Sequence, residues 1–172
     1  ETAGEFTILV GLVENHVPVM GLVFLPIKIT LYFAEKGKGA FCYDLNKWGK
    51  ISVRTVVEVS SCLALVSRHH LSGKEKKILD HLGITNTATI GSTLKVMEIS
   101  SGRGDVYLTT TNKMSQWDTC ASWCVISEAG GKMTDISGND LIYNTEIVKH
   151  ENGLLVTNGF IHEMAISKIS EL

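Results

Sequence analysis

Three features that commonly reveal a function class are missing from this chain of 172 residues. No apolar run approaches the roughly 20 residues that cross a bilayer. The four cysteines, Cys42, Cys62, Cys120 and Cys124, lack the paired spacing of a zinc site or of a disulfide-exchange motif. The formal net charge is −2 at pH 7, so no basic field attracts nucleic acid or a membrane surface. The sequence therefore predicts neither a membrane nor a nucleic-acid partner.

The cysteines and the first residues allow two further predictions, one about the thiols and one about the length of the natural protein. Cys120 and Cys124 lie one helical turn apart within an apolar stretch, which is typical of buried free thiols in a reducing, cytoplasmic protein. The sequence opens with Glu1-Thr2-Ala3 directly before a strand-like run and has no initiator methionine. We therefore expect a fragment of a longer protein.

Two different patterns of expected secondary structure divide the chain. With 44% hydrophobic and 20% charged residues, it can bury a core. Up to residue 43 it reads as antiparallel β-hairpins, with strands expected at 6–13, 17–25, 29–34 and 40–43. Residues 44–58 are mixed and polar, and we place a boundary there, which predicts a β segment at 1–58 and an α/β domain at 59–172.

From residue 60 onward, strands alternate with helices, as in parallel βαβ units. A capping box at Ser72 to Glu75 opens one helix, which stops at Gly83, and a turn is expected at Gly138-Asn139. Further helices are expected at 92–101, 119–129 and 160–169, and extended segments at 62–66, 87–90, 105–108, 132–136, 141–143 and 154–157. The predicted fold class is α/β (α+β overall), with an antiparallel hairpin segment followed by a mixed or parallel sheet with flanking helices.

The candidate site residues follow three of the predicted strands. Ser67 and His70 follow the first, Ser92 and Lys95 the second, and Asp118 precedes the apolar helix that Gly130-Gly131 ends. Loops at the carboxyl ends of parallel strands meet at one edge, where ligands bind. Singly, each residue also has an ordinary interpretation: His70 on the surface, Ser92 and Asp118 as helix caps, Lys95 as a solvated charge. The Lys-Gly-Lys-Gly stretch at 36–39 has no P-loop spacing and predicts a hairpin turn.

Three motifs resemble one known family. Trp-Asp-x-x-Ala at 117–121 followed by Glu-Ala-Gly-Gly at 128–131 resembles the C-terminal signature of the inositol monophosphatase superfamily. Ser-Arg-His-His at 67–70 is similar to the Ser-Arg-Ser-His of the 3′(2′),5′-bisphosphate nucleotidases, and Gly-Ser-Thr-Leu-Lys at 91–95 is similar to their Gly-Ser-Ser-Leu-Lys. The resemblance implies the C-terminal part of a layered αβαβα sugar-phosphatase fold.

The resemblance also implies roles for particular residues. Asp118 corresponds to a catalytic metal ligand beside the scissile phosphate, and the substrate-binding positions are Ser67, His70, Gly91, Ser92, Lys95 and Asp118. The implied activity is Mg²⁺-dependent removal of the 3′-phosphate from adenosine 3′,5′-bisphosphate, or from the related sulfated nucleotide, which leaves an AMP-like product. The alternatives are an inositol mono- or polyphosphate phosphatase, or a module that binds nucleotide without catalysis.

The sequence departs from the family pattern in three places. His69 stands where a second serine is expected, and Thr109 stands where related nucleotidases often have arginine. The paired glutamates and the Asp-Pro-x-Asp-Gly-Thr motif of the metal cluster have no counterpart in these residues. We therefore predict that the 172 residues alone are inactive, and that their partner is an N-terminal segment carrying those motifs or a second copy of the chain.

Overall fold

The computed structural model describes residues 6–67, 71–91 and 94–172. The first sheet consists of β1 (Ile8–Glu14), β2 (Val17–Leu25), β3 (Thr30–Glu35), β4 (Gly39–Asp44) and β5 (Lys47–Ile51). The second sheet consists of β6 (Leu63–Val66), β7 (Asn86–Thr89), β8 (Val106–Thr109), β9 (Lys132–Thr134) and β10 (Leu154–Thr157). The helices are α1 (Gly73–Leu82), α2 (Leu94–Ser100), α3 (Gln116–Glu128) and α4 (His162–Ile169), with a 3₁₀ turn, η1, at Val59–Ser61.

The first sheet is an antiparallel meander in the order β1-β2-β3-β4-β5. Its first turn places Asn15 and His16 at φ 49° and 66°, the backbone conformation that matches the twist of a two-residue hairpin. The four strands predicted from the sequence are confirmed. No strand was predicted at residues 44–58, so β5, which lies there, was missed.

The second sheet has the order β7-β6-β8-β10-β9 and is mixed. β7 and β8 both pair with β6 in parallel, whereas β10 runs antiparallel to β8 and to β9. The carboxyl ends of β6, β7 and β8 therefore share one edge. The extended segment expected at 141–143 is wrong: this region forms no strand, and only Asp140 makes an isolated bridge, to Thr134.

The helix termini follow the predicted capping residues. Glu75 and Ser72 form the expected capping box of α1, and Gly83 ends it in the left-handed conformation at φ 76°. Gly130 ends α3 at φ 92°. α3 begins at Gln116, so Asp118 is the third residue of the helix and not the residue before it.

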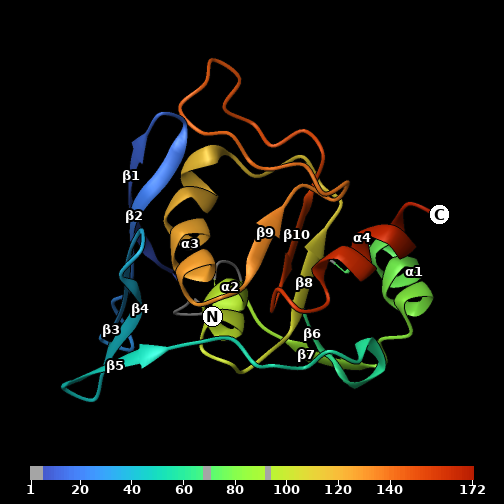
Figure 1. The fold of residues 1–172 in the computed structure, drawn as a ribbon, viewed down its shortest axis with the longest axis horizontal. Coiled ribbons are helices and arrows are strands. Elements are labelled where there is room, and N and C mark those ends of the chain that lie inside the picture. The colour runs from blue at the N-terminus through green and yellow to red at the C-terminus, as the bar shows by residue number, and fades with distance from the viewer. Residues whose placement is uncertain (1–5, 68–70, 92–93) are drawn as a thin grey trace.

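α3 lies between the two sheets (Figure 1). Its close approach to the first sheet depends on Gly11 and Gly21, because a Cβ at these positions would overlap Cys120 Sγ and the Ala121 carbonyl oxygen respectively. One core cluster joins residues of β2–β4, α2, α3 and β10, and a second joins β6, β8, α1 and α4. The chain is therefore mixed α+β, as predicted, while the division at residue 58 stays a prediction.

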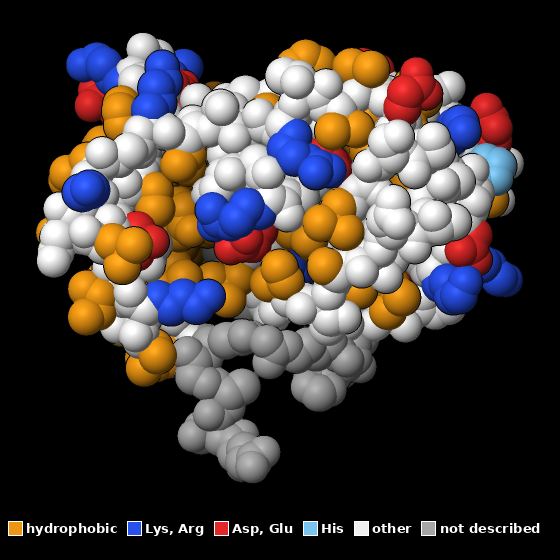
Figure 2. All heavy atoms as spheres, turned by 90° about the horizontal axis from the view of Figure 1, so that it is seen from below, with side chains coloured by type: hydrophobic (Ala, Val, Ile, Leu, Met, Phe, Trp, Pro, Cys, Tyr) orange, Lys and Arg blue, Asp and Glu red, His pale blue; other side chains and the backbone are white. Residues whose placement is uncertain are grey.

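The outer face of the first sheet is apolar and exposed. Ile8, Val10 and Leu12 alternate along β1 and are 50%, 50% and 48% exposed. Their partners on β2 are also apolar, so the stripe continues across the sheet. Figure 1 shows no helix of the described chain on this side, and Figure 2 shows hydrophobic side chains gathered toward the left, where the first sheet lies in Figure 1.

Candidate functional site

Three connections meet at the carboxyl edge of the parallel strands. Ser67 follows β6 directly, Gly91 follows β7, and the connection after β8 leads to Asp118 in the first turn of α3. This is the arrangement in which α/β proteins bind ligands. His70 and Ser92 lie outside the described residues, so their predicted roles stay predictions.

Asp118 is half-buried and has a hydrogen-bonding role within its helix. Its Oδ2 accepts a hydrogen bond from the Ser115 N–H at 2.8 Å. A carboxylate in the first turn also benefits from the positive end of the helix dipole. Asp118 therefore caps α3 from inside its first turn, as the partner of Ser115 in a capping box, and not as the residue before the helix. This role does not compete with metal binding, since a carboxylate has a second oxygen with which to bind a ligand.

Lys95 differs from the solvated charge that its ordinary interpretation predicted. Its side chain is 2% exposed, and Nζ donates a hydrogen bond to the Ile90 carbonyl oxygen at 3.3 Å. Nζ also lies 4.7 Å from the centroid of the Tyr107 ring, a cation–π distance. Burial raises the pKa of Tyr107 to about 12, with a further contribution from the Glu75 carboxylate. The side-chain nitrogen is thus held between the Ile90 carbonyl and the Tyr107 ring.

Glu75 was named in the sequence only as a capping residue, and the structure gives it a second contact. Its carboxylate is 4% exposed. Oε2 accepts the Ser72 N–H at 2.8 Å, and Oε1 accepts the Thr110 N–H at 3.0 Å. Glu75 therefore links the start of α1 to the connection after β8. The capping box indicated the first bond, but no local pattern could indicate the second.

Thr109 stands at the end of β8, where the family resemblance suggested an arginine. It is 7% exposed, and its hydroxyl lies 3.2 Å from that of Thr111. A threonine adds no charge to this edge. The sequence predicts two side chains at this edge that can carry a positive charge, His70 and Lys95. Of these two, Lys95 lies in the described part of the chain.

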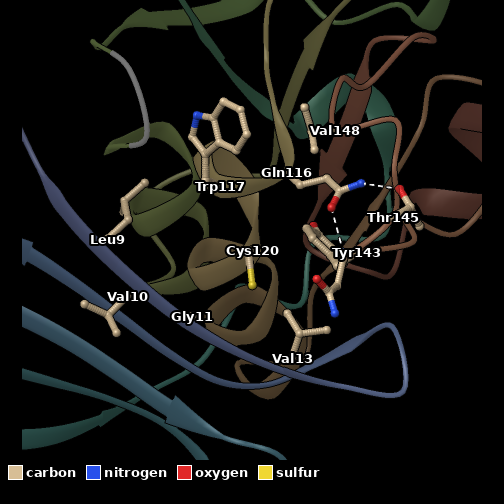
Figure 3. A pocket seen from close by; sticks show the side chains of 11 residues that line it. Leu9, Val10, Gly11, Val13, Gln116, Trp117, Cys120, Tyr143, Thr145 and Val148 are labelled. Carbon is tan, nitrogen blue, oxygen red and sulfur yellow. Dashed lines mark hydrogen bonds between the residues drawn. The ribbon is translucent and has the colours of Figure 1, made fainter.

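Two hollows adjoin the start of α3. A small cavity of about 140 Å³ is bounded by Asp118, Tyr107 and Ser122, among other residues. A larger groove of about 660 Å³ opens between β1 and the start of α3 (Figure 3). Trp117, which is 62% exposed, lies on its rim; Cys120 points into it, and Gln116 extends along its side toward Thr145.

The described residues do not complete a magnesium site. They contain no group of three or more His, Cys, Asp or Glu side chains placed to share an ion. Mg²⁺ prefers near-octahedral oxygen coordination, and Asp118 would be one ligand of such a site. The structure is also consistent with free thiols, because none of the four cysteines forms a disulfide. None of the described helices has the length and apolar composition needed to cross a membrane.

Comparison with solved structures shows which fold the chain has. Two solved structures share the fold over nearly the whole chain. The inositol monophosphatase of Anabaena (Nostoc) superimposes with a TM-score of 0.78 at 26% identity, covering 98% of this chain and 65% of that one. CysQ of Bacteroides thetaiotaomicron superimposes with a TM-score of 0.77 at 27% identity, covering 90% and 64%.

The sequence comparisons give the family. The profile of the inositol monophosphatase family matches residues 1–172, and the chain belongs to this family. The 3′(2′),5′-bisphosphate nucleotidase CysQ of Escherichia coli (strain K12) is 31% identical over 140 residues, covering 81% of this chain. The histidinol-phosphatase of Mycobacterium tuberculosis is 28% identical over 169 residues, covering 94%. The chain spans 55% and 61% of the length of these two relatives.

Proposed function

We propose that this chain is the substrate-binding part of a Mg²⁺-dependent phosphatase that removes the 3′-phosphate of adenosine 3′,5′-bisphosphate. The observation that carries the proposal is the convergence of Ser67, Gly91 and Asp118, each following a different strand, at one edge of the second sheet. The match to bisphosphate nucleotidases over 81% of the chain supports this substrate class.

Each residue has a distinct role in the proposal. Asp118 holds a metal ion together with ligands that the described residues do not supply. When bound, Mg²⁺ would polarise the phosphate and activate water. Ser67, His70 and Ser92 bind the unreactive 5′-phosphate and ribose through hydroxyl and imidazole groups. Lys95 places a positive charge beneath this phosphate and holds the Ile90 carbonyl, so its contribution is electrostatic and local.

One observation favours a broader phosphatase as the second candidate. Thr109 contributes no cation where nucleotidases often have arginine, so a substrate without a second phosphate would lose little at that position. An inositol phosphate is such a substrate. A module that binds nucleotide without catalysis is the third candidate, and a cytoplasmic location remains part of the proposal.

A comparison of two substrates tests the proposal in the completed enzyme. By completed enzyme we mean this chain supplied, fused or in trans, with the segment that carries the paired glutamates and Asp-Pro-x-Asp-Gly-Thr. Lys95→Met keeps the length of the buried side chain and removes its charge. It should raise KM for adenosine 3′,5′-bisphosphate about tenfold, which corresponds to losing about 1.4 kcal/mol of electrostatic attraction to the 5′-phosphate. KM for inositol 1-phosphate should change much less.

A second variant serves as the control for this comparison, and one outcome would contradict the assignment. Asp118→Asn should remove turnover of both substrates, because the amide keeps the size of the side chain and loses the charge that holds the metal. Equal changes in KM on both substrates after Lys95→Met would contradict the nucleotidase assignment and leave the broader phosphatase.

A further inference from the structure

Residues 143–150 wrap around the start of α3, and we name this segment the clasp. It contains no helix or strand, yet its backbone is paired with the helix start. The Gln116 N–H donates to the Val148 carbonyl at 2.8 Å, and the His150 N–H donates to the Met114 carbonyl at 3.0 Å. Ser115 and Lys149 form an isolated bridge between these two bonds. The clasp therefore lies alongside residues 114–116, which lead into the first turn of α3, where Asp118 lies.

The side chain of Gln116 fixes the clasp from inside. Its Nε2 donates to Thr145 Oγ1 at 2.6 Å and to the Ile147 carbonyl at 2.9 Å, while its Oε1 accepts the Asn144 N–H at 2.7 Å. Figure 3 shows this side chain reaching from the helix start toward Thr145. A glutamine that uses both ends of its amide, at 8% exposure, orders the loop around it and is held in place by it.

Thr119 provides a second, buried attachment. It is the residue after Asp118, is 2% exposed, and its hydroxyl accepts a hydrogen bond from Tyr143 Oη at 3.2 Å. The same hydroxyl lies 2.7 Å from His150 Nε2. Burial lowers the pKa of His150, although the Asp118 carboxylate acts in the opposite direction. A neutral imidazole either donates to or accepts from the hydroxyl, and both arrangements satisfy the pair.

The clasp is also attached to the first sheet. The Tyr143 N–H donates to the His16 carbonyl at 3.1 Å, and His16 Nδ1 lies 2.8 Å from the Tyr143 carbonyl oxygen. His16 belongs to the turn between β1 and β2. The start of α3 is therefore tied, through one segment, to a different sheet from the one whose edge it faces.

We propose that the clasp is a positioning device for Asp118, with Gln116, Thr119, Tyr143 and His150 as its positioning residues. It fixes the first turn of α3, so that the carboxylate holds a constant place relative to the edge where Ser67 and Gly91 lie. None of the four residues needs to touch substrate. The inference rests on the proposed function for the meaning of that placement, but the placement itself can be measured without activity.

The second sheet supplies a matched control. Thr134 is also a buried threonine, 0% exposed, whose hydroxyl lies 3.0 Å from the Nε2 of a buried histidine, His162. Thr134→Val and Thr119→Val thus remove the same group from the same kind of pair. They differ in location, because Thr134 lies in β9, where its hydroxyl donates to the Asp135 carbonyl rather than to any group of α3.

Hydrogen exchange in the 172-residue chain tests the positioning directly. The readout is the Ser115 amide, which donates to Asp118 Oδ2. Thr119→Val should speed its exchange about tenfold relative to Thr134→Val, a ratio that corresponds to about 1.4 kcal/mol. Thr119→Ser, which keeps the hydroxyl, should restore protection. Equal exchange of Ser115 in the two valine variants would overturn the inference.

A milder variant and a second readout cover the remaining outcomes. If Thr119→Val does not fold, Tyr143→Phe removes only the phenol oxygen, and unchanged Ser115 exchange in that variant would overturn the inference. In the completed enzyme, Thr119→Val should raise the half-saturating Mg²⁺ concentration about tenfold, within the range of roughly 10–100-fold seen when groups supporting a metal ligand are removed. Faster Ser115 exchange without any phosphatase activity in the completed wild-type enzyme would keep the clasp and contradict the proposed function.

Discussion

The two sheets of this protein are stabilised in different ways. The first is a meander whose inner face packs on α3 and whose outer face, with Ile8, Val10 and Leu12, is apolar and about half exposed. The second contacts α2 and α3 through one core cluster and α1 and α4 through another. It also has a buried charge beside it, at Asp105, which the described part of the first sheet does not. The second sheet is thus packed on both of its faces and adjoins a buried charge, and the connections after its parallel strands carry the candidate site residues.

The largest effect on stability is expected at Asp105, directly before β8 of the second sheet. Its carboxylate is 0% exposed, pairs with Arg54, and accepts the Leu63 N–H at 2.8 Å and Asn158 Nδ2 at 3.2 Å. Asp105→Ala should lower the free energy of unfolding by about 3–5 kcal/mol, because the buried Asn158 amide and the Leu63 N–H lose their acceptor and the partly exposed Arg54 loses its counter-ion. Urea denaturation measures this.

A surface pair in the first sheet is the control for Asp105. Glu35 and Lys38 form an exposed ion pair with an N–O distance of 3.5 Å. Glu35→Ala should change the free energy of unfolding by at most about 1 kcal/mol, as exposed pairs do. Similar losses at Asp105 and Glu35 would mean that the two sheets do not differ in this respect.

The second prediction is a pH dependence that arises at His162, the first residue of α4, where it contacts Thr134 and Thr157 of the second sheet. Burial, with help from Lys132, lowers the pKa of His162 to about 4, whereas an imidazole in the unfolded chain titrates near 6.5. The unfolded state therefore binds more protons below about pH 6.5. Stability from this group should be complete above about pH 6.5 and should fall by up to about 3 kcal/mol as the pH approaches 4.

Chemical denaturation across this pH range measures the loss. His162→Gln can still hydrogen-bond Thr134 and Thr157 but has no proton to gain, so its stability should vary less between about pH 6.5 and about pH 4. An identical pH profile for the variant would show that another group causes the loss.

The third prediction concerns the close packing of the first sheet against α3. A side chain at Gly21 would overlap the Ala121 carbonyl oxygen, so the sheet must shift to accept it. Gly21→Ala should destabilise the protein by about 1–3 kcal/mol, the usual cost of overpacking. Gly49 is the matched site, because a Cβ there would meet no atom within 4 Å, and Gly49→Ala should have little effect. Equal midpoints of thermal unfolding would contradict the close packing.

The smallest effect is expected on the outer face of the first sheet. Val10 is 50% exposed, so Val10→Thr should change the free energy of unfolding by only about 0.5 kcal/mol. If two copies of the chain associate through this apolar stripe, the same change should weaken their association, because it interrupts the stripe. Sedimentation measures the second effect. A loss of several kcal/mol would mean that this face is packed in solution.

The sequence predicted most of the first sheet because its strands alternate in character and its turns contain favourable residues. It missed β5 because four of the five residues of Lys47–Ile51 are exposed and leave no apolar pattern. The stretch 141–143 misled in the opposite way: Leu141 and Tyr143 are apolar because they are buried against the core, without strand pairing.

At the candidate site, local patterns located the residues but not their contacts. Strand–loop–helix order placed Ser67, Lys95 and Asp118 after strands that share one edge, and the structure has this strand order. His70 and Ser92, which the same argument named, lie outside the described residues. The sequence did not predict the burial of Lys95 against the Ile90 carbonyl, the bond from Thr110 to Glu75 or the clasp around Gln116. Such contacts depend on the packed fold, and no periodicity or motif spacing encodes them.

One measurement tests most directly whether the carboxyl edge of the second sheet binds the nucleotide. Adenosine 5′-phosphate, the product of the proposed reaction, is titrated into the isotope-labelled 172-residue chain, and amide chemical shifts are followed by NMR. If this edge is the binding site, the shifts of Ser67, Gly91 and Asp118 should change together with one dissociation constant. Changes confined to the groove between β1 and α3, or no change at millimolar nucleotide, would contradict it.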